Sequence, residues 1–237
     1  MKVLVLSDSH ISPVCPNVEE WRALGEWCVQ EKPDYIIHLG DVANLDSLAW
    51  KIAARGPFTT DAELSCVLEH LKAFESVIKA EQLKNRKDKK KMYKPKRVLC
   101  LGNHDIRNNF TGIADLFRAR GWDVHDYLSP FIIDDIAFCH CMMRGLTDQP
   151  CTSAQELLEN WHSTIVVGHG HARDYSESFN IVSGEKIFAI KCPVFNSDDT
   201  GWAAQTRNKW SRGFTVIDTD TKEFVWKDIE CLHKLLT

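Results

Sequence analysis

Acidic, amide and imidazole side chains stand at five places along the chain, each at the end of an apolar run. In an α/β protein the ends of such strands meet at one edge of the sheet, where ligands usually bind. Carboxylate and amide oxygens combined with imidazole nitrogens suit Mn²⁺, Fe, Zn²⁺ or Ni²⁺ better than Mg²⁺ or Ca²⁺, which prefer oxygen alone. The pattern therefore predicts a metal centre. Its candidate ligands are Asp8, His10, Asp41, Asn103, His140, His169 and His171.

Strands and helices alternate in the first half of the chain, and they must place these residues. Apolar and β-branched runs predict buried strands, each ending next to a candidate ligand. Apolar residues at helical spacing predict amphipathic helices between them. The expected strands are 2–7, 35–39 and 97–101, and the expected helices are 17–31, 61–91 and 113–120.

The second half of the chain reads mostly as strands, so a second sheet is expected. The first two of these strands should pair as a hairpin that turns at Asp134 and Asp135. The sequence thus predicts an α/β fold in which two packed mixed β-sheets are flanked by helices. The length favours a single domain over 1–237, with a helical, basic insertion around 60–97. The expected strands are 131–133, 136–139, 164–167, 187–190, 213–218 and 223–229.

Composition narrows the class of protein. The formal net charge of −4 gives the whole molecule no strong attraction for a polyanion, so any nucleic-acid binding must be local. The apolar run after Lys2 is too short for a secretory signal, and no window approaches the length of a membrane span. Nine cysteines without a Cys-x-x-Cys spacing point to reduced thiols in a cytoplasmic protein.

Five sequence blocks match, in order, the pattern of the calcineurin-like metallophosphoesterase superfamily: Asp8-Ser-His10, Gly40-Asp41, Gly102-Asn103-His104-Asp105, His140 and Gly168-His169-Gly170-His171. The chain most resembles its small stand-alone phosphoesterases of bacterial and bacteriophage type. The resemblance implies a four-layer αββα sandwich. Two departures are visible, because Cys141 replaces the usual Gly after His140 and Gly170 replaces a common Thr.

The resemblance also implies a division of the ligands between two divalent metal ions. Asp8, His10, Asp41 and His171 would hold the first ion, and Asp41, Asn103, His140 and His169 the second. Asp41 would bridge them. Mn²⁺ is the expected metal, with Ni²⁺, Fe²⁺/Fe³⁺ or Zn²⁺ as alternatives.

Such a centre hydrolyses phosphoesters, because two cations can share a bridging hydroxide that attacks phosphorus and can also clamp the phosphoryl oxygens. His104 is expected to protonate the leaving oxygen or to stabilise the charge developing on it, with Asp105 orienting its ring. The leading hypothesis is a phosphodiesterase acting on nucleotides or nucleic acid. A phosphomonoesterase, either a nucleotidase or a protein phosphatase, is the close alternative. A non-catalytic scaffold of the same fold is the alternative from another class, although every ligand is present here.

Two further segments bear on the substrate. Nine basic residues between Lys84 and Arg97 can hold a phosphate backbone, although a solvated helix end is the more common reading of such a run. Tyr93 is the one aromatic residue among them, which argues against base stacking. Arg173, Trp202 and Arg207 are candidate substrate-binding residues in the long stretch after His171. A phosphoester substrate is the expected partner, with no membrane and no obligatory protein partner.

Overall fold

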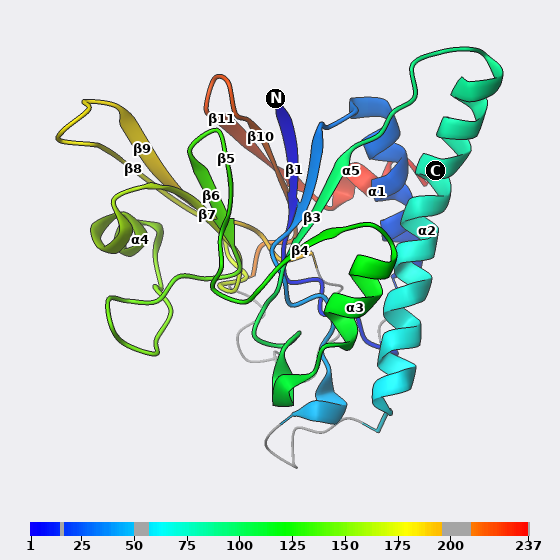
Figure 1. Ribbon diagram of the computed structural model, residues 1–237, viewed down its shortest axis with the longest axis horizontal. Coiled ribbons are helices and arrows are strands. Elements are labelled where there is room, and N and C mark those ends of the chain that lie inside the picture. Colours follow the sequence, from blue (N-terminus) through cyan, green and yellow to red (C-terminus); the bar gives the residue numbers. More distant parts are fainter. Residues whose placement is uncertain (15–16, 50–56, 196–209, 237) are drawn as a thin grey trace.

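The computed structural model describes residues 1–14, 17–49, 57–195 and 210–236, which form two β-sheets with helices on their outer faces (Figure 1). The first sheet has six strands in the order β11-β10-β1-β2-β3-β4, and the second has five in the order β5-β6-β7-β9-β8. The strands are β1 (Lys2–Leu6), β2 (Tyr35–His38), β3 (Lys96–Cys100), β4 (Asp123–His125), β5 (Phe131–Ile133), β6 (Ile136–Cys139), β7 (Thr164–Val167), β8 (Asp174–Phe179), β9 (Lys186–Lys191), β10 (Gly213–Asp218) and β11 (Glu223–Asp228).

Both sheets are mixed, and each has a parallel centre. In the first sheet β1, β2, β3 and β4 run parallel, whereas β10 pairs with β1 antiparallel. In the second sheet β6, β7 and β9 run parallel, with antiparallel β5 and β8 at the edges. Parallel strands end at the same edge of a sheet, so residues that follow them are brought together.

The strand β1 shows how the layers are held together. Leu4 and Leu6 pack into the core beneath the helices, and Val3 and Val5 pack into the core between the two sheets. Successive side chains of a strand point to opposite faces, so an unbroken apolar run buries both faces of the sheet. The two sheets therefore pack face to face, as the sequence predicted.

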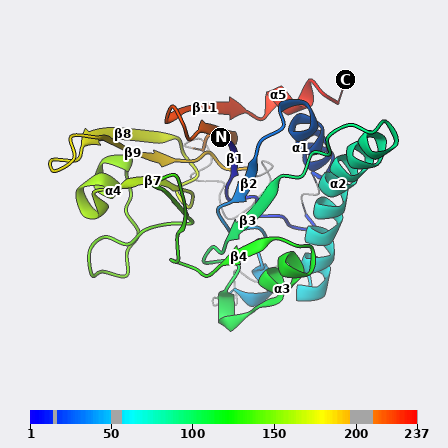
Figure 2. The same ribbon diagram turned by 45° about the horizontal axis from the view of Figure 1, so that its top comes forward.

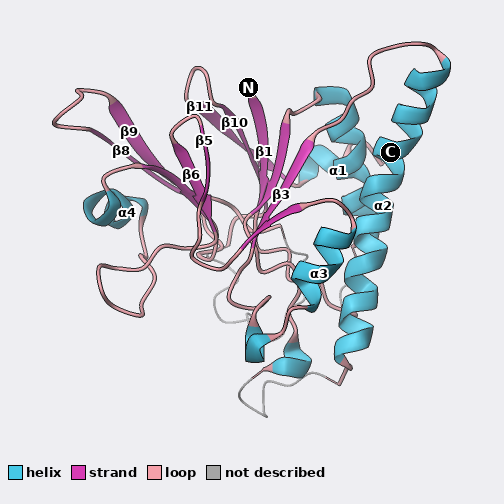
Figure 3. Ribbon diagram, in the orientation of Figure 1, coloured by secondary structure: helices cyan, strands magenta, loops and turns pink. Residues whose placement is uncertain are grey.

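Helices complete the two outer layers. Helices α1 (Val18–Glu31) and α2 (Thr60–Lys87) lie side by side in both views (Figures 1 and 2). Together with α3 (Gly112–Ala119) and α5 (Glu230–His233) they contribute to the core on the first sheet. On the other side, α4 (Ala154–Trp161) packs on the second sheet (Figure 3). The predicted α/β architecture of two packed mixed sheets with flanking helices is confirmed.

Several elements were not predicted, and each has a weak sequence pattern. The strands β4 and β8 are edge strands with few apolar residues, so little alternation marks them. Helix α4 spans only eight residues, although its N-cap Ser153 accepts a hydrogen bond from the backbone N–H of Glu156 at 3.1 Å. Helix α2 ends at Lys87, short of the expected 91, and Lys89 has a left-handed backbone.

Among the described residues, no helix has the length and apolar character that crossing a bilayer requires.

Candidate metal centre

The structure brings all seven predicted ligands to one place. They follow the carboxyl ends of β1, β2 and β3 in the first sheet and of β6 and β7 in the second (Figure 1). Their donor atoms form groups in which all atoms lie within 4.8 Å of one another. One group is Asp8, His10 and His171, and a second is Asp41, His140 and His169. The side chain of Asn103 joins the second group, since its Oδ1 lies 3.0 Å from Nε2 of His140.

Asp41 lies between the two groups. Its Oδ2 is 3.4 Å from Nε2 of His140 and 3.9 Å from Nε2 of His10. Its Oδ1 accepts a hydrogen bond of 2.8 Å from the backbone N–H of His104, which fixes the carboxylate. A Cβ at Gly102 would overlap this oxygen, so glycine is needed at that position. Asp41 is therefore held where a ligand shared by two ions would have to be.

Five of the candidate ligands have a left-handed backbone, which is uncommon for residues other than glycine. The φ angles are 53° for Asp8, 43° for His10, 51° for Asp41, 63° for His169 and 55° for His171. Such conformations cost of order 1–3 kcal/mol each and cluster at functional sites. Here they lie directly after β1, β2 and β7, where they turn the chain toward the centre that the side chains share.

Among the described residues, the buried carboxylates of Asp8 and Asp41 have only histidines, and no lysine or arginine, at ion-pair distance. The Oδ1 atom of Asp8 receives no hydrogen bond from any described residue, although it lies 3.3 Å from Nε2 of His171. Burial and the nearby Asp8 carboxylate raise the pKa of Asp41 to about 8. Two buried carboxylates side by side are unfavourable unless cations compensate them. Divalent metal ions between these groups would supply that compensation.

The imidazole rings are oriented by hydrogen bonds outside the centre. Nδ1 of His140 donates to the backbone oxygen of Leu39 at 2.7 Å, so its Nε2 carries no proton in the neutral ring and faces inward. Nδ1 of His10 lies 3.0 Å from the side-chain oxygen of Asn44. Its Nε2 lies 3.2 Å from Nε2 of His171. A hydrogen bond at one ring nitrogen that leaves the other aimed inward is typical of metal-binding histidines.

The donor set fits two divalent ions. It consists of carboxylate and amide oxygens and imidazole nitrogens, and within the described residues no cysteine belongs to any of the groups. Burial lowers the pKa of His169 to about 4 and lowers the pKa of His10 as well. Neutral imidazole is the form that binds metal. The surroundings therefore keep these rings ready for ligation.

His104 lies beside this centre, in a third group with His10 and Asp41. Its Nδ1 donates to the backbone oxygen of Asn44 at 2.9 Å. A guanidinium nitrogen of Arg107 lies 2.9 Å from its Nε2, and the same guanidinium donates to the Asn44 oxygen at 2.6 Å. Burial and the charge of Arg107 lower the pKa of His104 to about 3. The ring is thus neutral and is fixed from both sides.

Sequence reasoning missed Arg107 and Asn44, both of which contact His104. Asn44 lies three residues after the candidate ligand Asp41, and Arg107 lies three residues after His104. Arg107 begins the short 3₁₀ helix Arg107–Asn109, and its guanidinium reaches His104 and the backbone oxygen of Asn44. The sequence signal that could have identified Arg107 was its positive charge so close to the Asn-His-Asp block.

The hydrogen bonds described for Asp105 go to the backbone and not to the ring of His104. Its buried carboxylate accepts hydrogen bonds from three backbone N–H groups, those of Asp41, Val42 and Gly102, at 2.8–3.0 Å. All of its hydrogen bonds are therefore used to hold the loops after β2 and β3 together. It positions Asp41, and the orientation of the His104 ring comes instead from Asn44 and Arg107.

Of the three candidate substrate-binding residues, only Arg173 lies in the described part of the chain. The guanidinium of Arg173 pairs with Asp228 and lies 5.9 Å from the ring of Trp226, so it is engaged by β11. This placement does not support the predicted contact with substrate. Trp202 and Arg207 lie outside the described residues. Trp210, from the same stretch, packs edge-on against the ring of His171 with centroids 4.5 Å apart.

The sequence profile of the calcineurin-like phosphoesterase family matches residues 1–217, nearly the whole chain. The chain belongs to this family. No curated protein matches its sequence. Among solved structures it is similar to YfcE, a phosphoesterase from E. coli, with a TM-score of 0.43 and 14% identity over 97% of this chain and 100% of that one. It is also similar to TT1561 of Thermus thermophilus, with a TM-score of 0.47 and 9% identity over 96% and 98% of the two chains.

As a calcineurin-like phosphoesterase, the protein has its buried histidines and aspartates where the family chemistry requires metal. The two departures from the family pattern leave every candidate ligand in place. Cys141 is buried, and its sulfur lies 3.3 Å from the hydroxyl of Tyr127. Gly170 leaves room for the side chain of Lys191, because a Cβ there would lie 2.5 Å from the Lys191 ammonium.

Proposed function

We propose that this calcineurin-like phosphoesterase is a phosphodiesterase that acts on nucleotides or nucleic acid with two divalent metal ions. The observation that carries the proposal is the position of Asp41 between the two donor groups. Two ions that share one carboxylate lie close enough to act on the same phosphate. Asp8, His10, Asp41 and His171 would hold one ion, and Asp41, Asn103, His140 and His169 the other.

The mixture of oxygen and nitrogen donors favours Mn²⁺, with Ni²⁺, Fe²⁺/Fe³⁺ or Zn²⁺ as alternatives. When bound, the pair of ions supplies an activated water as nucleophile and neutralises charge on the phosphoryl oxygens. The protein supplies the rest of the chemistry. Asp105 holds the loop of Asp41 through backbone hydrogen bonds, and Leu39 and Asn44 orient the rings of His140 and His10.

His104 is the proposed catalytic residue at the leaving group. In the neutral ring Nδ1 holds the proton through Asn44, so Nε2 has none to donate, and the positive charge that would stabilise the leaving oxygen comes from Arg107. The Arg107 guanidinium next to Nε2 brings a permanent positive charge to the same point. We include Arg107 in the machinery on this ground, as a group that stabilises negative charge on the substrate.

The diester preference is supported by the charges beside the centre. Arg107 contributes one positive charge next to His104, and its guanidinium also donates to the backbone oxygens of Asn44 and Leu45. The buried ammonium of Lys191 lies near Gly170 but donates to the backbone oxygen of Thr152. Arg107 is therefore the charge next to His104, and one such charge suits the single negative charge of a phosphodiester better than the two charges of a monoester. A nucleotidase or phosphatase would be expected to provide further cationic contacts to the substrate.

The test is hydrolysis of bis-p-nitrophenyl phosphate and p-nitrophenyl phosphate by metal-stripped protein supplied with Mn²⁺, Ni²⁺, Zn²⁺ or Mg²⁺ in turn. Asp41→Asn and His104→Ala are the control variants. We expect diester cleavage that requires metal and both residues. Turnover of the monoester alone would transfer the proposal to a nucleotidase or phosphatase. Hydrolysis of neither ester with any metal would favour the scaffold.

We also infer a reducing, cytoplasmic location and no obligatory protein partner. Eight cysteines are free in the described part of the chain, and seven of these are buried. Burial raises the pKa of thiols such as those of Cys66 and Cys141 to about 11, so they stay protonated and unreactive. Free thiols in this number suit a compartment that keeps them reduced.

A further inference from the structure

The basic segment 84–97 lies at the end of the first sheet where its parallel strands begin, and the candidate metal centre lies at the opposite end of these strands. Lys96 opens β3, whereas Asn103 follows the end of that strand. At the rise of an extended chain, the two positions are roughly 20 Å apart. The basic end of α2 accordingly lies on the side of the molecule where β1 begins (Figure 1). This segment is therefore a separate surface from the metal centre.

The charge on this segment is concentrated and largely unpaired. It holds nine basic residues and one acidic residue, a net charge of +8, while the whole chain carries −4 and the remainder therefore −12. Lys90 pairs with Asp88, and Arg97 pairs with Glu75. Within the described chain, the other lysines of the segment have no carboxylate at ion-pair distance. These are Lys84, Lys87, Lys89, Lys91, Lys94 and Lys96.

Stabilisation of a helix end accounts for only part of this charge. Lys84, Arg86 and Lys87 occupy the last turn of α2, where cations interact favourably with the helix dipole. The effect falls off within one turn, and Lys91, Lys94 and the residues around them lie beyond the helix. Holding exposed like charges together costs free energy through repulsion, which an anionic partner would relieve.

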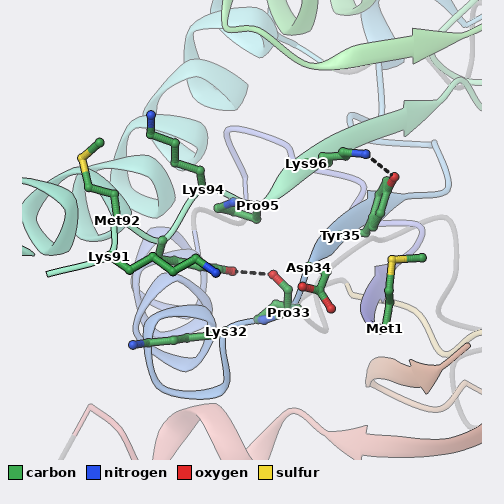
Figure 4. Close-up of a pocket in the computed structure, with 11 residues that line it drawn as sticks. Met1, Lys32, Pro33, Asp34, Tyr35, Lys91, Met92, Lys94, Pro95 and Lys96 are labelled. Carbon is green, nitrogen blue, oxygen red and sulfur yellow. Dashed lines mark hydrogen bonds between the residues drawn. The ribbon is translucent and has the colours of Figure 1, made fainter. Parts of the chain in front are cut away.

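A hollow of about 660 Å³ opens among these lysines (Figure 4). Its rim carries four cationic side chains, Lys32, Lys91, Lys94 and Lys96, and one carboxylate, Asp34. Its apolar surface includes Pro33, Pro95 and the ring of Tyr35.

Tyr35 supplies the aromatic surface that the basic segment itself lacks. The Lys96 ammonium donates to its hydroxyl at 2.8 Å and lies 4.9 Å from the centre of its ring. On the inner side, the hydroxyl of Tyr93 donates to the backbone oxygen of Pro33 at 3.1 Å and ties the two walls together. The hollow thus combines a ring from β2 with ammonium groups from the segment between α2 and β3.

We propose that this surface binds single-stranded nucleic acid, with phosphates on the lysines and one base in the hollow beside Tyr35. Proteins that bind single strands combine a cationic track with aromatic surfaces on which bases stack. A lipid headgroup layer would use the charge but would leave the apolar hollow unfilled. The surface lies apart from the metal centre, so binding here does not depend on the hydrolytic function proposed above.

The experiment measures binding of a fluorescein-labelled single-stranded oligonucleotide by fluorescence anisotropy, with a chelator present so that no hydrolysis occurs. The triple variant Lys91→Gln/Lys94→Gln/Lys96→Gln should bind at least about 10-fold more weakly. The slope of log affinity against log salt should become shallower by about 2, since each phosphate contact on a single strand contributes about 0.7. The matched control Lys72→Gln/Lys186→Gln/Lys222→Gln removes three charges elsewhere and should bind like the wild type.

An oligonucleotide of the same length with abasic sites tests the hollow, because it keeps the phosphates and removes the bases. We expect it to bind about 10-fold more weakly to the wild type, in keeping with the usual contribution of a stacked base. Equal affinity of the triple variant and its control would overturn the proposal. So would binding to phosphatidylserine vesicles without binding to the oligonucleotide. Hydrolysis of bis-p-nitrophenyl phosphate by the triple variant, measured separately, reports on the metal centre alone.

Discussion

The guanidinium of Arg107 lies 2.9 Å from Nε2 of His104, while Nδ1 of the same ring donates to the backbone oxygen of Asn44. Arg107 also donates to that oxygen, so the three residues form a closed set of contacts beside Asp41. His104 therefore works next to a fixed positive charge.

Replacing Arg107 should lower catalysis without unfolding the protein. We expect Arg107→Ala to reduce kcat for a diester by about 10²- to 10³-fold, the usual loss for one preorganised donor to a developing oxyanion. Arg107→Lys keeps the charge but cannot hold the forked contact to His104 and Asn44, so it should recover only part of the rate. Steady-state kinetics at saturating metal measure both. A wild-type kcat in Arg107→Ala would show that Arg107 takes no part in catalysis.

The shared position of Asp41 predicts different metal losses in two variants. Asp41→Asn replaces the carboxylate shared by both proposed sets with a neutral, weaker amide oxygen, and it should leave less than one metal ion per chain. His171→Ala affects only the set that contains Asp8 and should retain about one ion, because the other set is intact. Elemental analysis after dialysis gives the stoichiometry, and about two ions are expected for the wild type. Equal losses in the two variants would contradict the proposed division.

Metal should also stabilise the fold, since the donor groups are assembled only in the folded chain. Each of the two ions, present at 100 times its Kd, should add about 2.7 kcal/mol to the free energy of unfolding. Denaturation of the wild type and of Asp41→Asn, each with and without Mn²⁺, tests this. The variant should respond much less than the wild type, and an equal response would place the stabilising ions elsewhere.

Gly170 and Lys191 should prove to be coupled. A Cβ at Gly170 would lie 2.5 Å from the ammonium of Lys191, which is buried and donates to the backbone oxygen of Thr152. Gly170→Thr, which introduces the side chain common in the family, should destabilise the metal-free protein by about 1–3 kcal/mol through overpacking. Urea denaturation of Gly170→Thr, Lys191→Ala and the double variant forms a cycle. Additive changes in the free energy of unfolding would mean that the Lys191 side chain moves aside without cost.

Buried His38 should make stability depend on pH. Its Nδ1 accepts from the backbone N–H of Gly40 and its Nε2 donates to the hydroxyl of Ser9, so the folded ring is neutral. Burial lowers its pKa from 6.5 to about 3, with a smaller raising effect from Asp8 and a smaller lowering effect from His140. Between these values the unfolded chain binds a proton that the folded chain does not. Stability is therefore present above pH 6.5 and is lost as the pH falls below it.

The variant His38→Gln removes this titration while keeping a donor for Ser9. Its free energy of unfolding should fall less steeply than that of the wild type below about pH 6, by about 1.4 kcal/mol per pH unit. Both proteins are unfolded in urea at a series of pH values with the same metal concentration. Parallel pH profiles would show that His38 does not titrate on unfolding.

The sequence by itself determined the strands that carry the candidate ligands. Apolar runs such as 3–6, buried on both faces, leave little choice of structure, and polar residues after them must lie at the sheet edge. The order of the five blocks was enough to identify the family, since ligand type and spacing are properties of the chain. The edge strands β4 and β8 were not predicted, because their polar residues give little of the alternating pattern that marks a strand.

Only the tertiary structure decided which side chains meet. Asp105 and Arg107 stand close to His104 in the sequence, yet Asp105 bonds to the backbone of Asp41 and Arg107 reaches the ring. The backbone path of the loop after β3 sets these directions, and residue type alone does not encode them. The hollow beside Tyr35 likewise joins β2 to the segment after α2. Contacts between distant segments arise from sheet order and register, which local pattern does not contain.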